Sequence, residues 1–279
     1  MAELLVNPYT PNPNPSEEKH VSTVVTNDVS SPLLSGKAHF VLRRLHSLTG
    51  VLFGGYIMVH LIINATLVER VRHDGSPTVF QQQVDKIHSL PFLIPIELAM
   101  IILPLAFHTL YGLYISFQGK SNPLNYGYGK NWLYVAQRWS AIIIMFFALF
   151  HVLTFKGLVS LPGDFDAKLT FIPLDHATQS TVNHMHAAWW VGWVIYPIGI
   201  LAATFHLANG FWTAAISWGV TVSKQAQQRF GYACVGVFIF TTLCGFAALT
   251  STLASKPDWG KTLKIQQGIP EMVSPNASN

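Results

Sequence analysis

Four histidines lie within long apolar segments of this 279-residue chain: His60, His108, His151 and His206. Each occupies a different segment, long enough to cross a bilayer. An ionisable side chain at such a depth is unfavourable, so it is a candidate for function. Any one of them could instead be a core histidine bonded to a neighbouring carbonyl. Four on successive segments favour a shared role, and imidazole nitrogen is a common ligand of metals and of haem iron.

The elements that must position these histidines are five predicted membrane-spanning helices. They cover residues 39–68, 89–118, 131–158, 186–218 and 229–254. Each holds at least the ~20 residues that are needed to cross ~30 Å of hydrocarbon. Apolar residues make up 50% of the chain and charged residues only 11%, and the mean hydropathy is +0.35. The expected fold class is therefore all-α, an integral membrane bundle of five transmembrane helices.

The depths of the histidines arrange them as two pairs. Successive spans run in opposite directions, and each residue advances a helix by about 1.5 Å. His60 and His151, here called the outer pair, lie roughly 10 Å from mid-membrane on the side opposite the N-terminus. His108 and His206, the inner pair, lie roughly 6–7 Å from mid-membrane on the N-terminal side. The two levels thus differ by roughly 16 Å along the membrane normal.

Two haems suit two pairs of histidines. Two neutral imidazoles can occupy both axial positions of an iron porphyrin. Zinc normally takes four ligands, whereas each level supplies two obvious ones. A proton relay would need more carboxylates, and Glu97 is the only acid deep within a span. We therefore expect one haem per pair, held without covalent attachment because the chain has no C-x-x-C-H motif.

Three regions are expected along the chain. Residues 1–36 are polar and proline-rich, contain no apolar signal segment and predict a disordered tail. Residues 37–255 hold the five spans and both haems. Residues 256–279 form a polar C-terminal tail.

Basic residues are concentrated on the N-terminal side of the membrane. That side carries Lys37, Arg43, Arg44, Lys120, Lys130, Arg138, Lys224 and Arg229, with no acid close to the span ends. The opposite side mixes both signs, so the positive-inside rule predicts a cytoplasmic N-terminus. The pI near 9.0 favours contact with membrane lipid or an acidic partner protein, and not with nucleic acid.

Five short segments carry a family resemblance. In chain order they are RRLHSLTG at 43–50, HLIIN at 60–64, FHTLYG at 107–112, QR at 137–138 and HLANGFW at 206–212. Together with the spans of residues 37–255, they resemble the two-haem, single-polypeptide cytochrome b subunit of succinate dehydrogenases and fumarate reductases. The resemblance implies a bacterial cytoplasmic membrane anchor with two haems b. Its ligand pairing agrees with the depth argument, and the inner haem is the one nearer the iron–sulfur subunit.

The resemblance also implies partners and a substrate. In that family a flavoprotein subunit oxidises succinate, an iron–sulfur subunit carries the electrons, and the anchor passes them to or from a quinone, commonly menaquinone. The chain itself would have no succinate chemistry. Some fumarate reductases of this type carry a glutamate for proton transfer two residues before the fourth haem ligand. Thr204 stands at that position here, which favours succinate oxidation.

Three alternatives remain open on the sequence. A fumarate reductase anchor would run the same electron path in reverse. The two-haem anchor of another respiratory enzyme, such as nitrate reductase, also has five spans, although the RRLHS and HxxNG segments argue against it. A transporter whose histidines handle protons or metal ions belongs to a different class, and a haem spectrum would separate it from the others.

The start of the first span holds further candidate cofactor contacts: Arg43, Arg44, His46 and Ser47. Haem propionates are carboxylates, which an arginine fork binds through two hydrogen bonds. The alternative for Arg43 is topology-setting charge with its stem along apolar surface. For His46 and Ser47 the expected ligand is a propionate or a quinone. Gln137, Arg138 and Lys224 face the same side and share this ambiguity.

Glu97 is the candidate catalytic residue, for proton exchange with quinone near the outer haem. It is expected close to the level of the outer pair, where a carboxylate needs either a partner or a proton. A structural hydrogen bond to a neighbouring helix is the alternative. The loop of residues 159–185 is long. His176, His184 and His186, in and beside it, are expected to be solvated rather than metal ligands.

Overall fold

The computed structural model describes residues 36–69, 77–118, 129–158, 170–174 and 176–260. Almost all of the predicted N-terminal tail, and the C-terminal tail beyond residue 260, lie outside this part. The chain divides into two units, residues 1–41 and residues 42–279. Of the first unit, residues 36–41 form the opening turns of helix α1. All other elements below belong to the second unit.

The described elements are all helical. They are α1 (Gly36–Ala65), η1 (Thr66–Glu69), α2 (Val79–His88), α3 (Leu93–Glu97), η2 (Leu98–Ile102), α4 (Leu103–Gln118), α5 (Gly129–Phe155), α7 (Ala177–His186), η3 (Val191–Ile195), α8 (Tyr196–Ser217) and α9 (Lys224–Ala254). Five stretches are long and apolar enough to cross a membrane: Gly36–Glu69, Leu93–Gln118, Asn131–Phe155, Val191–Ser217 and Lys224–Ala254. The all-α class and the five predicted spans are confirmed.

The two largest differences from the predicted span boundaries are at the starts of the fifth and fourth spans. The fifth span begins at Lys224 rather than 229, because Ser223 caps the helix by accepting a 3.1 Å hydrogen bond from the Ala226 amide. The fourth span begins at Val191 rather than 186. The residues before it form the separate helix α7, so the predicted loop of residues 159–185 is partly helical.

Both π-helical segments of the spans precede a proline. Pro104 lacks the N–H that would bond the carbonyl of Met100, within η2. Pro197 likewise leaves the carbonyl of Trp193, within η3, without its usual partner. A missing donor loosens the i→i−4 ladder, and a π turn is one way to reconnect it. The prolines thus change the path of these two helices without ending the spans.

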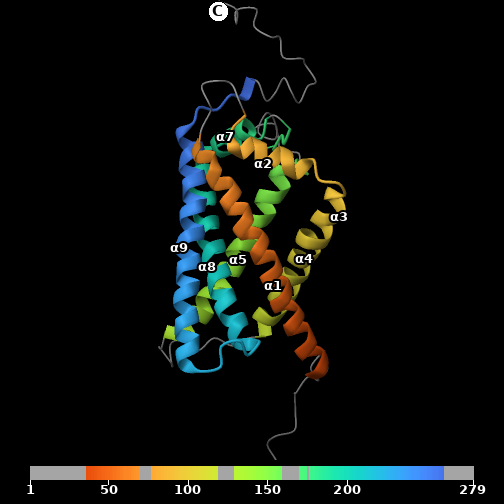
Figure 1. Ribbon diagram of the computed structural model, residues 1–279, viewed down its shortest axis with the longest axis vertical. Helices are drawn as coiled ribbons and strands as arrows, with labels where there is room; N and C mark the ends of the chain where they lie inside the picture. Colours follow the sequence, from red (N-terminus) through yellow and green to blue (C-terminus); the bar gives the residue numbers. More distant parts are fainter. Residues whose placement is uncertain (1–35, 70–76, 119–128, 159–169, 175, 261–279) are drawn as a thin grey trace, which may run out of the picture. The chain divides into compact units, whose positions relative to one another are not determined.

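The spanning helices pack unequally. Helix α8 contacts both α5 and α9 closely, whereas the backbones of α1 and α4 approach the others less closely (Figure 1). Gly199 of α8 lets the Phe147 ring approach its backbone, and Gly245 of α9 lies against Ile200. Small residues of this kind allow membrane helices to pack tightly. In the described part of the chain, the closest backbone packing among the spans is therefore that of α8 with α5 and α9.

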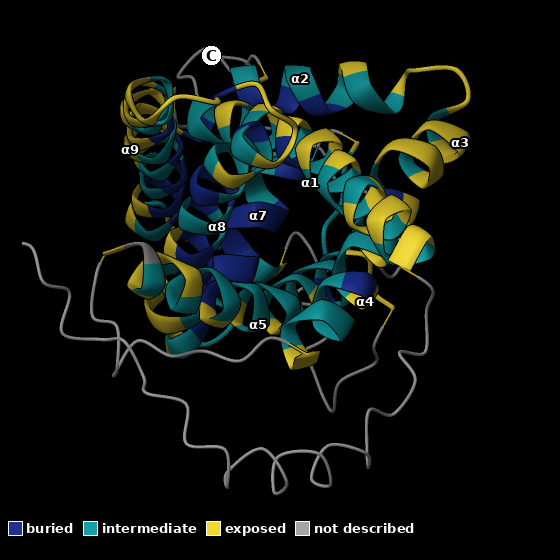
Figure 2. Ribbon diagram, turned by 90° about the horizontal axis from the view of Figure 1, so that it is seen from below, coloured by how far each residue is buried: buried dark blue, intermediate teal, exposed yellow. Residues whose placement is uncertain are grey.

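The outward surface of the bundle is apolar. Buried residues gather on the sides of α7, α8 and α9 that face one another, and exposed residues face outward (Figure 2). Leu110, Phe146 and Leu243 are each more than 60% exposed. Exposed apolar side chains on spanning helices are what contact with lipid requires.

Helices α2 and α7 lie across the end of the bundle where α1 terminates, and together we call them the end cap (Figure 1). Thr78 caps α2 through the amide of Gln81 at 3.1 Å, and its hydroxyl lies 2.8 Å from that of Thr178. Phe80 and Ala177 belong to one buried cluster with residues of η1 and α9. The end cap is therefore a packed layer over the outer pair's end of the bundle.

Candidate functional site

The structure brings both predicted histidine pairs together. In the outer pair, the rings of His60 on α1 and His151 on α5 have centroids 6.0 Å apart and planes at 79°. In the inner pair, the rings of His108 on α4 and His206 on α8 have centroids 6.2 Å apart and planes at 89°. Each pair therefore joins two helices that are far apart in sequence.

The two pairs lie at different levels of the bundle. Tyr196 of α8 is bonded to His151 of the outer pair, and His206 of the inner pair lies ten residues further along the same helix. Ten residues of α-helix rise about 15 Å. This separation is close to the roughly 16 Å expected from the span midpoints.

The ring spacing fits an iron atom between each pair. An imidazole nitrogen binds a first-row transition metal at about 2 Å, so two rings on opposite sides of one iron have centroids about 6 Å apart. The values of 6.0 and 6.2 Å match this spacing. In the described part of the chain, no three His, Cys, Asp or Glu side chains form a metal-binding group. A two-ligand arrangement suits a porphyrin, which supplies the other four donors itself.

The inner pair has its Nδ1 atoms fixed by the protein. Nδ1 of His108 lies 3.0 Å from the carbonyl oxygen of His46. Nδ1 of His206 lies 3.2 Å from the carbonyl oxygen of Gln137 and 3.2 Å from the hydroxyl of Ser140. A ligating histidine usually donates its second ring N–H to such an acceptor, which leaves Nε2 for the metal.

The outer pair is held differently. Nδ1 of His151 lies 2.9 Å from the hydroxyl of Tyr196, and that hydroxyl lies 2.9 Å from Nε2 of His184. The amide of Asn64 donates to the carbonyl of His60 at 2.7 Å and also lies 3.4 Å from His60 Nε2. At the outer level the partner of His151 Nδ1 is a side chain, whereas at the inner level both Nδ1 atoms face backbone carbonyls, with the Ser140 hydroxyl beside one of them.

The expectation that His184 is solvated is wrong. Its side chain is 0% exposed, and His186, two residues on, bonds the carbonyl of Thr252 through Nε2 at 3.2 Å. The reason is that helix α7 packs against η3 and α9 instead of looping into solvent. One signal was available in the sequence: residues 177–186 contain no Lys, Arg, Asp or Glu, which is unusual for a solvated segment.

A cavity of about 1100 Å³ lies between α1, α4, α5 and α8. Both histidines of the inner pair line it, and neither of the outer pair does. Drug-sized ligands occupy pockets of about 300–1,000 Å³, so the space is large enough for a porphyrin. Its lining is mainly apolar, with polar groups near the start of α1. An apolar slot with one polar edge suits a flat cofactor that carries carboxylates at one rim.

Two glycines keep the rings at the inner level in place. A Cβ on Gly50 would lie 2.5 Å from Cε1 of His108, and one on Gly112 would lie 3.0 Å from Cε1 of His46. Real Cβ atoms do not approach other atoms at 2.5 Å, so Gly50 is needed for the position of the His108 ring. Both glycines belong to segments that carry the family resemblance, but the sequence alone assigned neither of them a role.

The candidates at the start of α1 separate into two groups. Arg43, His46 and Ser47 line the cavity. The His46 ring stacks on His108, with centroids 4.0 Å apart and planes at 10°. Arg44 turns away, because its guanidinium donates to the carbonyl of Ser217 and lies 5.0 Å from the Trp218 ring. Of the two arginines, Arg43 is thus the one placed to meet a cofactor carboxylate.

Glu97 has an ion-pair partner, which is one of the two possibilities expected for a carboxylate within a span. Its Oε2 lies 3.2 Å from Nζ of Lys156, at the end of α5, and the two side chains are 32% and 58% exposed. The carboxylate therefore sits near the rim of the bundle. Its role with quinone stays a prediction.

Thr204, two residues before His206, is completely buried. Its hydroxyl donates to the carbonyl of Ile200 at 2.9 Å and lies 2.9 Å from the hydroxyl of Thr242 on α9. It therefore joins two helices, and its hydrogen-bonding capacity is used within the bundle.

The comparisons with known proteins agree with this architecture. No protein-family model matches the sequence. The succinate dehydrogenase cytochrome b558 subunit of Bacillus subtilis (strain 168) is 32% identical over 217 residues, which cover 77% of this chain and 98% of that protein. Its five apolar spans make the chain a multi-pass membrane protein. Its similarity to this relative makes it part of an oxidoreductase complex. It belongs to the succinate dehydrogenase cytochrome b subunit family.

Proposed function

We propose that this chain anchors a succinate:quinone oxidoreductase in the membrane and carries electrons between an iron–sulfur subunit and quinone. Two haems b serve the path, one at the outer pair and one at the inner pair. The observation that supports this best is the 6.0 and 6.2 Å spacing of two histidine pairs from four helices. The name of the 32% identical relative supports the same complex.

The residues of each site have separate tasks. Haem, when bound, supplies one-electron redox chemistry at its iron. The four histidines of the two pairs would hold the iron, and His108, His151 and His206, whose Nδ1 atoms have partners, would do so through Nε2. The carbonyls of His46 and Gln137 keep the Nδ1 protons of the inner pair in place. The apolar lining excludes water, and Arg43 would bind a propionate.

The hydrophilic partners are a flavoprotein subunit and an iron–sulfur subunit, and we place them on the cytoplasmic side. Helices α5 and α9 both begin at the end of the bundle where α8 terminates (Figure 1), and Arg44 bonds the Ser217 carbonyl at that end of α8. This end carries the basic residues and the inner pair. The positive-inside rule then gives a cytoplasmic N-terminus in the bacterial cytoplasmic membrane.

The quinone, menaquinone or another, is proposed to react near the outer pair. Glu97 lies in the second span and pairs with Lys156, five residues beyond His151 on α5. Quinone reduction consumes protons, and a carboxylate near the rim can pass them from water to an apolar site. Thr204 in place of a proton-carrying glutamate favours succinate oxidation as the direction.

A haem count on the purified complex tests the proposal. We expect the reduced-minus-oxidised spectrum and the pyridine haemochrome assay to give two b-type haems per chain. Acid–acetone should extract both, because no thioether attachment is possible. One haem per chain would contradict the two-site proposal. None would contradict the electron-transfer function and revive the transporter alternative.

A further inference from the structure

We propose that Tyr196 and His184 are positioning residues that lower the redox potential of the outer haem, through a hydrogen-bonded chain from His184 to the ligand His151. This inference rests on the proposed haem ligation by His60 and His151. The chain consists of two contacts of 2.9 Å each, His151 Nδ1 to the Tyr196 hydroxyl and that hydroxyl to His184 Nε2.

The direction of both hydrogen bonds follows from ligation. If Nε2 of His151 gives its lone pair to iron, a neutral imidazole must carry its proton on Nδ1. His151 is then the donor and the Tyr196 oxygen the acceptor. The tyrosine has one proton, which it donates to Nε2 of His184. His184 is consequently the terminal acceptor of the chain and carries its own proton on Nδ1.

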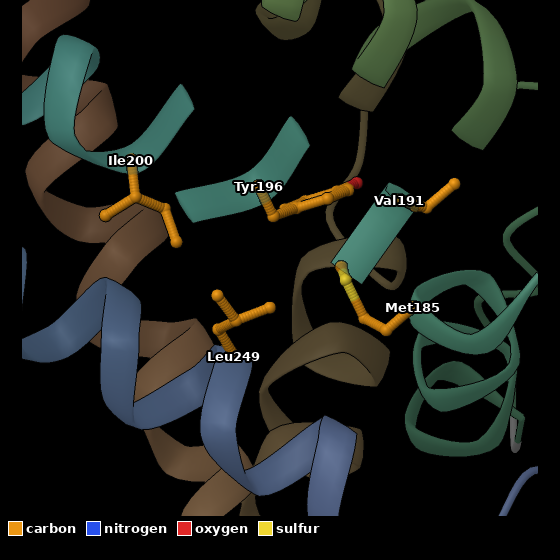
Figure 3. Close-up of a cluster of buried hydrophobic side chains, with 5 residues drawn as sticks. All are labelled: Met185, Val191, Tyr196, Ile200 and Leu249. Carbon is orange, nitrogen blue, oxygen red and sulfur yellow. The ribbon is translucent and has the colours of Figure 1, made fainter. Parts of the chain in front are cut away.

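The tyrosine ring is fixed by packing. Tyr196 is 6% exposed and belongs to a buried cluster with Met185, Val191, Ile200 and Leu249. Its hydroxyl points away from Ile200 and Leu249 (Figure 3). The ring also meets Phe147 edge-on, with centroids 5.4 Å apart. Because the ring cannot turn, the hydroxyl oxygen is held in front of His151.

His184 is fixed as firmly. Its side chain is completely buried, and its ring lies against Phe155 at 4.1 Å and Phe150 at 6.2 Å between centroids. A buried hydroxyl without an acceptor is unfavourable, so His184 determines where the Tyr196 proton points. By accepting that proton, His184 also makes the tyrosine oxygen a stronger acceptor for His151, because hydrogen bonds in a chain polarise one another.

This arrangement differs from that of the inner pair. There, Nδ1 of both His108 and His206 faces a backbone carbonyl, which no side-chain substitution removes, although the Ser140 hydroxyl also lies 3.2 Å from His206 Nδ1. At His151 the acceptor is a side chain, and its strength depends on a second side chain from the end cap. An acceptor at Nδ1 raises the basicity of the ligand, which favours the ferric state and lowers the potential. The end cap thereby acts on the outer haem alone.

Redox titration of the assembled complex tests the inference. Tyr196→Phe keeps the packed ring and removes the acceptor. We expect the potential of the outer haem to rise by an amount equal to a three- to tenfold change in the ferric-to-ferrous ratio, where tenfold is about 59 mV. The inner haem serves as internal standard and should not move. The low-spin EPR signal of the outer haem should shift as well, because its ligand is free to turn.

Variants at His184 separate positioning from packing. His184→Leu removes the acceptor for Tyr196 and should raise the outer potential by less than Tyr196→Phe does. His184→Gln keeps an acceptor near the position of Nε2 and should restore most of the parental potential. His186→Gln, on the same helix but bonded to Thr252, is the matched control and should leave both potentials unchanged.

The outcomes are distinguishable from a failure of the proposed function. If both haems are present and Tyr196→Phe leaves the outer potential unchanged, the inference is wrong although the haem assignment stands. An equal shift of both haems would mean a general change of the bundle and would also overturn it. If His184→Leu and His184→Gln behaved alike, His184 would have no part in positioning. Absence of haem from the parental complex would instead refute the proposed function.

Discussion

The Glu97 carboxylate and the Lys156 ammonium form an ion pair of 3.2 Å that joins the second span to the end of the third. Lys156 lies five residues beyond His151 and directly follows Phe155, the last residue of α5. Both side chains are partly exposed at this end of the bundle. A carboxylate between the rim and the outer pair is well placed to pass protons.

We predict that Glu97→Gln slows succinate-driven quinone reduction by about tenfold or more, a modest share of what a general acid or base contributes. The amide keeps the shape and one hydrogen bond to Lys156 but cannot carry a proton. Both haems should be retained, and their reduction by succinate should be unaffected. Steady-state quinone reduction across pH 6–8 measures the first effect, and stopped-flow haem reduction the second.

Glu69→Gln is the matched control for Glu97→Gln. Glu69 lies at the same end of the bundle, and its carboxylate accepts the Val79 amide at 2.7 Å, which an amide oxygen can also do. Its activity should equal that of the parent. Parental quinone turnover in Glu97→Gln at every pH would assign Glu97 to the structural ion pair alone.

We predict that His60→Ala and His151→Ala remove one and the same haem, and that His108→Ala and His206→Ala remove the other. The reason is that each haem loses one of its two axial ligands. Optical spectra and redox titrations of the four variants identify the missing component. His88→Ala, whose Nδ1 bonds the carbonyl of Val84 in the end cap, should keep both haems. Loss of a common component in the His60 and His108 variants would refute the pairing.

We predict that Gly50→Ala disturbs the inner haem. The new Cβ would lie 2.5 Å from Cε1 of His108, so the ligand ring must move. Overpacking of this kind costs about 1–3 kcal/mol. The measurements are the inner haem's spectrum and its occupancy after purification.

Gly55→Ala is the control on the same helix. No atom lies within 4 Å of its added Cβ, and alanine in a helix is more stable than glycine by roughly 0.5–1 kcal/mol. We expect both haems at full occupancy and unchanged or slightly raised thermal stability. If the two alanine variants gave the same inner-haem spectrum, the close approach of Gly50 to His108 would have no consequence.

We predict that the basic end of the bundle docks the iron–sulfur subunit. Lys130 and Lys224, and Lys120 outside the described residues, should form crosslinks to it, because a positive surface attracts an acidic partner. Lys86 and Lys156, at the opposite end, should not. Mass spectrometry of the crosslinked complex identifies the pairs. Crosslinks from that subunit only to residues 159–185 would reverse both the docking face and the topology.

The sequence was sufficient for the spans and for the pairing of the histidines. Apolar runs long enough for a bilayer leave helices as the main way to satisfy the backbone in lipid. Once the helices and their alternating directions are known, a constant rise per residue fixes depth. His60 then has to lie level with His151, and His108 level with His206.

The same reasoning could not predict what surrounds each ligand. Depth says nothing about rotation of a helix about its axis, which is set by packing against its neighbours. Only the tertiary structure separates Arg43, which lines the cavity, from Arg44, which binds Ser217. It also decided that Glu97 would meet Lys156 and that Gly50 would face His108.

His184 shows most clearly what the sequence alone could not predict. Its segment has no apolar run long enough to cross a membrane, and on that ground the sequence predicts His184 in a solvated loop. In the structure α7 packs on the bundle and places His184 2.9 Å from the Tyr196 hydroxyl. The sequence by itself determined the five spans and the levels of the four histidines, because the bilayer imposes a one-dimensional rule. The tertiary structure decided the partners of those histidines, because hydrogen bonds depend on side-chain directions in three dimensions.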